Sequence, residues 1–144
     1  MDEPILLKPV LRPVLHDLDE MKQSSVSAYT LAEIVSEKLR ALLQSRARLA
    51  ERGWGASRVC RDYYDLWRIL SAEGRMVGQI PDLLERKCQV RQVAFSSQAE
   101  LVSPELFQVA RTEWVAQLQP FVLHAPGVEQ VLTEVKPLIL GLWK

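Results

Sequence analysis

Lys38 is a charged residue on a helical face that is otherwise apolar. At about 100° per residue, Lys38 falls near the centre of an apolar arc in the segment from residue 30 to residue 49. The apolar members of that arc are Leu31, Ile34, Val35, Leu39, Ala41, Leu42 and Leu43. An ammonium that faces a protein core is costly unless it is paired. A lysine at the edge of a helix can snorkel to solvent instead, but the central position of Lys38 disfavours that alternative.

Asp62 lies in the same way on the apolar face of the next helical segment. The apolar arc around it consists of Val59, Tyr63, Leu66, Trp67, Ile69 and Leu70. Arg61, Tyr64 and Asp65 are expected to point elsewhere on this helix. If the two apolar stripes face each other, Lys38 and Asp62 meet. Two interpretations then remain open, namely a structural buried ion pair and a functional site lined by both side chains.

The charge around these two residues is strongly biased. Between residues 38 and 75 the chain carries nine cations and four anions, a local net charge of +5. Such a segment around a Lys/Asp pair suits a phosphorylated ligand, for example a nucleoside triphosphate or an RNA end. A solvated helical face would have the same charge pattern, so charge alone leaves both alternatives open.

Capping and turn signals predict the helices that would position this pair. Helices are expected over residues 30–49, 58–72, 81–93, 104–119 and 128–142. Thr30 and Glu33 match a capping box at the start of the first helix. Ser103 followed by Pro104 is typical of a cap and a first-turn proline. A bend is expected at Pro137 in the last helix.

The N-terminal part of the chain is different in character. Prolines punctuate residues 4–15, where residues 5–7 are the candidate for one edge strand. A polar loop is expected over residues 16–25, and residues 26–29 are expected to be extended. The sequence therefore predicts a mainly α fold with a short N-terminal β-strand fringe.

Composition limits the remaining possibilities. The chain has 144 residues, which suits one domain, and its 18 basic and 18 acidic residues give zero net charge. Zero net charge argues against a protein that coats nucleic acid by bulk basicity. Apolar runs too short for a transmembrane helix and an acidic N-terminus predict no membrane association and a cytoplasmic location. Cys60 and Cys88 are expected to be reduced thiols, and the four tryptophans are expected to be core or partly buried anchors.

Two motifs together resemble a known family. The first is Tyr29-Thr-Leu-Ala-Glu-Ile-Val-Ser-Glu-Lys-Leu-Arg-Ala-Leu-Leu-Gln44, and the second is Arg61-Asp-Tyr-Tyr-Asp-Leu-Trp67. With Lys87-Cys88, Trp114 and Leu118 farther along, this pattern is similar to the C-terminal part of the AbiEii/AbiGii family of nucleotidyltransferase toxins. The resemblance covers essentially the whole chain.

The resemblance implies a helical C-terminal domain of a polymerase-beta-like nucleotidyltransferase, from a bacterial toxin–antitoxin and phage-defence system. It implies nucleotide transfer from an NTP to an acceptor such as a tRNA 3′ end, and a cognate antitoxin protein as partner. Lys38 matches the catalytic lysine of the third family motif, and Asp62 matches the catalytic aspartate of the fourth. Nucleotide or acceptor binding is expected from Arg40, Arg61, Tyr64 and Asp65.

The chain departs from the family pattern in one respect. The family's first two motifs, a glycine-rich turn for the triphosphate and an Asp-x-Asp pair for Mg²⁺, have no counterpart here. Asp17-Leu18-Asp19 spells Asp-x-Asp but lies in a polar loop with no glycine turn before it. Residues 1–28 are therefore expected to be a remnant of the nucleotidyltransferase core, and residues 29–144 to be the helical domain.

Three hypotheses follow from this departure. The chain is expected to be part of a toxin that binds Mg²⁺ only when complete, and to be an incomplete catalyst alone. Alternatively, it is a non-catalytic helical module that binds an antitoxin, RNA or a separate catalytic subunit. In the third alternative it is a decayed remnant whose Lys–Asp pair is merely structural.

Overall fold

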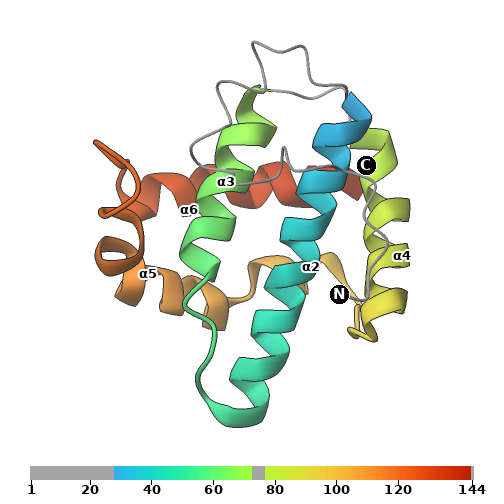
Figure 1. Ribbon diagram of the computed structural model, residues 1–144, viewed down its shortest axis with the longest axis horizontal. Helices are drawn as coiled ribbons and strands as arrows, with labels where there is room; N and C mark the ends of the chain where they lie inside the picture. Colours follow the sequence, from blue (N-terminus) through green and yellow to red (C-terminus); the bar gives the residue numbers. More distant parts are fainter. Residues whose placement is uncertain (1–27, 73–76, 144) are drawn as a thin grey trace.

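The computed structural model describes residues 28–72 and 77–143, and all regular elements in these ranges are helical (Figure 1). The α-helices are α2 (Ala28–Arg52), α3 (Val59–Ala72), α4 (Ile80–Arg91), α5 (Pro104–Leu118) and α6 (Val128–Leu140). Short 3₁₀ helices are η2 (Val77–Gln79), η3 (Gln98–Val102) and η4 (Gly141–Trp143). The mainly α prediction is confirmed. The predicted edge strand and polar loop lie outside the described residues.

Helices α2 and α3 run antiparallel, side by side, through the middle of the molecule (Figure 1). Helix α4 packs against α2, whereas α5 and α6 pack against α3. The buried core follows from this arrangement, because α2 supplies one continuous apolar stripe and α3 is covered on several sides. Fully buried side chains at the centre include Leu39, Leu42, Tyr63, Leu66 and Ile69. None of the helices in the described ranges is long and apolar enough to span a bilayer.

Local signals explain where several helices begin and end. The side chain of Ser103 accepts a hydrogen bond from the Leu106 amide at 3.3 Å, so the predicted cap of α5 is confirmed. Pro81 lies in the first turn of α4, as predicted. Helix α2 stops at Gly53, whose φ of 79° favours glycine and whose amide donates to the Leu49 carbonyl at 2.8 Å.

The predicted start of the first helix is wrong. Helix α2 begins at Ala28, so Tyr29 is helical and Thr30 lies inside the first turn instead of capping it. The carboxylate of Glu33 is buried and lies 3.0 Å from Lys87 Nζ. An ion pair in a buried setting holds that carboxylate more strongly than an exposed amide would, and the expected capping box is therefore absent here.

The tryptophan prediction holds for three of the four residues. Trp114 is buried and donates its indole N–H to the Pro126 carbonyl at 2.9 Å. Trp67 and Trp143 are partly buried against the core. Trp54 is 63% exposed, so for this residue the prediction is wrong. It lies in the loop between α2 and α3, where no other element covers it.

Candidate functional site

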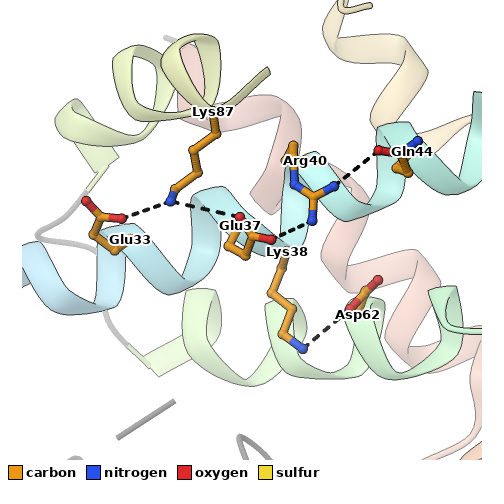
Figure 2. Close-up of polar contacts among 7 residues, drawn as sticks. All are labelled: Glu33, Glu37, Lys38, Arg40, Gln44, Asp62 and Lys87. Atoms are coloured by element: carbon orange, nitrogen blue, oxygen red, sulfur yellow. Dashed lines mark hydrogen bonds and ion pairs between the residues drawn. The ribbon is translucent and has the colours of Figure 1, made fainter. Parts of the chain in front are cut away.

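Lys38 meets Asp62 where α2 packs against α3, as the helical pattern predicts (Figure 2). Its Nζ lies 3.4 Å from Asp62 Oδ1. The side chain of Lys38 is 12% exposed and that of Asp62 is 1% exposed. Lys38 therefore does not snorkel to solvent but pairs inside the helix interface.

Asp65 also belongs to this cluster, and the expectation that it points elsewhere is wrong. Its Oδ2 lies 2.9 Å from Lys38 Nζ, closer than the Asp62 oxygen, and its side chain is 1% exposed. Tyr64 is likewise buried. The helical wheel missed both because it assumed one buried stripe, whereas α3 is packed by α2, α5 and α6. Residues three apart are neighbours on a helix, so one lysine reaches both aspartates.

The two carboxylates are electrostatically unusual. Burial raises the pKa of Asp62 and of Asp65, and the Lys38 ammonium opposes the rise in each case. One oxygen of each, Asp62 Oδ2 and Asp65 Oδ1, accepts no hydrogen bond from the described residues. A buried carboxylate oxygen without a donor is costly, so each could accept a hydrogen bond from a ligand without losing an existing one.

A second ion-pair chain runs along α2 beside this cluster (Figure 2). Lys87 on α4 lies 3.0 Å from Glu33 and 3.9 Å from Glu37. Glu37 in turn pairs with the guanidinium of Arg40, which also donates to Gln44 at 3.4 Å. Arg40 is thereby held in place although its side chain is only 9% exposed. Sequence reasoning missed Lys87 as a charge partner, and the apolar neighbours Leu83 and Leu84 were the available signal.

These charges surround a pocket of about 280 Å³ between α2, the start of α3 and the end of α4. Its charged lining consists of Lys38, Arg40, Arg48, Arg58 and Arg91 with Glu37 and Asp62. We call this the basic pocket. Five cations against two carboxylates make it complementary to an anionic ligand such as a phosphate.

Two candidate residues do not line the basic pocket. The guanidinium of Arg61 lies 4.6 Å from the centre of the Phe121 ring, and Tyr64 packs beside Trp67. The structure thus brings Lys38, Asp62 and Arg40 to the basic pocket and leaves Arg61 and Tyr64 outside its lining. Asp65 is linked to it only through Lys38.

The described residues do not fit a magnesium ion. No group of three or more potential ligand side chains gathers in residues 28–72 and 77–143. Asp62 and Asp65, the two nearest carboxylates, already share the Lys38 ammonium, which would compete with a divalent cation. The Asp17-Leu18-Asp19 triplet lies outside the described residues.

The cysteines have no role in this site. Cys60 and Cys88 are both free and buried, as predicted. Burial raises the pKa of Cys60 to about 12 and that of Cys88 to about 11. Both are thus protonated thiols at neutral pH, and neither is a nucleophile.

Comparison with known proteins identifies a family. The model of the family described as "Nucleotidyl transferase AbiEii toxin, Type IV TA system" matches residues 1–134. No curated protein and no solved structure gives a significant match. The matched range contains every candidate residue of the site.

Proposed function

Because the chain belongs to the AbiEii nucleotidyl transferase toxin family of a type IV toxin–antitoxin system, we propose that the basic pocket with Lys38 and Asp62 is a nucleotidyl transfer site. The observation that carries this proposal is the position of the Lys38–Asp62 pair in the wall of a pocket rich in arginine. A purely structural pair would need no ligand-sized space beside it. The family also implies an antitoxin as partner.

The proposed reaction transfers a nucleotide from an NTP to an acceptor hydroxyl, for which a tRNA 3′ end is the candidate. The acceptor oxygen forms a bond to the α-phosphorus, the bond to the β-phosphate bridge breaks, and pyrophosphate leaves. The hydroxyl proton must be removed, and negative charge develops on the leaving phosphates. The site therefore needs a cation near the phosphates and a proton acceptor or orienting group near the hydroxyl.

The residues present can fill these two roles. Lys38 and Arg40 supply positive charge at the pocket wall, where low solvent exposure strengthens their interaction with phosphate oxygens. Asp62 Oδ2, which accepts no hydrogen bond from the described residues, can accept one from the acceptor hydroxyl. Asp65 is a positioning residue, because it holds the Lys38 ammonium without lining the basic pocket.

The two aspartates provide a matched experiment. Asp62→Asn and Asp65→Asn remove the same charge from buried partners of the same lysine, but only Asp62 lines the basic pocket. We expect both variants to bind a nucleoside triphosphate, measured by calorimetry. We expect Asp62→Asn to reduce transfer of α-³²P-labelled nucleotide to RNA by about 100-fold or more, and Asp65→Asn to reduce it less. Equal transfer by Asp62→Asn and the unaltered chain, or no nucleotide binding by the folded chain, would refute the proposal.

A further inference from the structure

Trp54 is an exposed aromatic side chain with a defined neighbour. It is 63% exposed, and the guanidinium of Arg52 lies over its ring at 4.2 Å from the centroid. A cation over one face leaves the indole able to accept a flat group on the other face. Large aromatic side chains rarely remain exposed without a partner molecule.

The backbone presents this tryptophan in a specific way. Gly53 and Gly55, on either side of it, have φ values of +79° and +94°, which side chains other than glycine rarely adopt. A Cβ atom at Gly55 would lie 3.7 Å from the guanidinium of Arg52 and 3.8 Å from Cδ of Arg48. The loop therefore turns tightly over two arginine side chains with Trp54 at its tip.

This tip adjoins the basic pocket. Arg48, which approaches Gly55 under the loop, also lines the pocket. Arg58, just beyond the loop on its other side, lines the pocket as well. The exposed indole and the phosphate-sized basic pocket are thus joined through Arg48 into one continuous surface.

An aromatic platform beside a basic pocket has the chemistry of a single-strand nucleic-acid site. An unpaired base stacks on an aromatic face whatever its identity, and arginines bind the phosphates beside it. A double helix hides its base faces, so it cannot use the indole. We infer that Trp54 stacks an unpaired base of a single-stranded RNA whose phosphates are held by Arg48 and Arg58. This inference rests on the proposed function, since it assigns the docking of the acceptor strand.

A second exposed aromatic residue provides a matched control. Phe121 is 52% exposed and lies under the guanidinium of Arg61, much as Trp54 lies beside Arg52. Phe121 belongs to the loop between α5 and α6 and does not line the basic pocket. It therefore has the aromatic–arginine pair without the phosphate site.

The test measures binding of a fluorescein-labelled single-stranded RNA of about 12 nucleotides and of its blunt duplex by fluorescence anisotropy. We expect Trp54→Ala to weaken single-strand binding between about 5-fold and 150-fold, because stacking contributes about 1–3 kcal/mol per base. Phe121→Ala is expected to leave it unchanged. Arg48→Ala is expected to reduce the dependence of log K on log salt by about one. Trp54 is exposed, so its replacement is expected to leave the thermal unfolding midpoint unchanged.

Three results would overturn this inference. They are equal single-strand affinity of Trp54→Ala and the unaltered chain, an equal loss in Phe121→Ala, and no preference of the unaltered chain for single strand over duplex. Failure of the proposed function has a different signature, since the strand would then bind through Trp54 but receive no labelled nucleotide. Conversely, transfer that needs Asp62 while Trp54→Ala binds RNA normally would refute only the role of Trp54.

Discussion

Replacing Lys38 with methionine tests whether one ammonium holds two buried carboxylates. Methionine fills a similar volume but carries no charge, so the variant leaves Asp62 and Asp65 facing each other in the interface between α2 and α3. Both carboxylates are 1% exposed, so water cannot replace the lost partner. We expect Lys38→Met to be strongly destabilising at neutral pH.

The structure gives the size of this effect. At an effective dielectric constant of about 20, charges separated by 3.4 Å and 2.9 Å attract by roughly 5 kcal/mol each. Desolvation of the three groups cancels much of that attraction. Removal of one partner from a buried pair typically costs about 3–5 kcal/mol. That is a large part of the roughly 5–15 kcal/mol by which a domain is stable.

The loss is expected to depend on pH with a definite sign. Burial already raises the pKa of both aspartates above the ordinary value of 3.8, and removal of Lys38 takes away the charge that opposes this rise. A carboxyl group whose pKa is raised in the folded state favours folding fully below its unfolded pKa. That contribution is lost as the pH rises through the folded pKa. The deficit of Lys38→Met therefore grows from about pH 4 upward.

Urea unfolding of Lys38→Met and the unaltered chain at about pH 4 and about pH 7.5 measures this difference. A triple variant that combines Lys38→Met with asparagine at both aspartates is the control, and it should recover most of the lost stability. A deficit that is equal at the two pH values, or smaller than about 1 kcal/mol at neutral pH, would refute the assignment of a buried three-charge cluster.

Three further predictions concern the rest of the fold. Cys60 and Cys88 should not react with iodoacetamide at pH 8 until the chain is unfolded, because burial raises their pKa values to about 12 and about 11; modification of the folded chain, measured by mass spectrometry, would contradict this. Lys87→Met should lower the urea midpoint by several times more than Arg111→Ala, since Lys87 is paired in the interior and Arg111 is exposed; equal midpoints would argue against the buried chain of charges. Ser103→Ala should cost about 1 kcal/mol in urea unfolding through loss of the α5 cap, and Ser103→Thr should retain most of it.

The helix boundaries were predictable where a local signal determines them. A serine followed by a proline starts α5, and a left-handed glycine ends α2, because each satisfies backbone groups within a few residues. The start of α2 was not predictable in this way. Glu33 fits a capping box in sequence, but its partner Lys87 lies on another helix. Spacing along one segment cannot show a charge that arrives from a distant one.

Trp54 shows a second limit of sequence reasoning. Tryptophan is usually buried at least in part, and composition therefore predicted a core anchor. The loop that carries Trp54 is held by two glycines with positive φ and lies beyond the ends of both helices. Whether a side chain between such glycines is covered depends on what packs over the loop, and the helical periodicity of the flanking segments carries no information about that.

The pairing of Lys38 with Asp62 was predictable, whereas the inclusion of Asp65 was not, and the difference bears on the charge of the whole segment. Two aspartates and one lysine leave a net negative charge in the interior, which needs compensation. Arg58 lowers the pKa of Asp62, and Arg61 and Arg68 lower that of Asp65.

Part of the basic bias between residues 38 and 75 therefore neutralises the buried aspartates, which is neither of the two explanations that the sequence left open. Arg40 and Arg48 are not among the charges that act on the aspartates, and both line the basic pocket. These two arginines are the ones whose removal should weaken anion binding with the least effect on folding at the aspartate cluster.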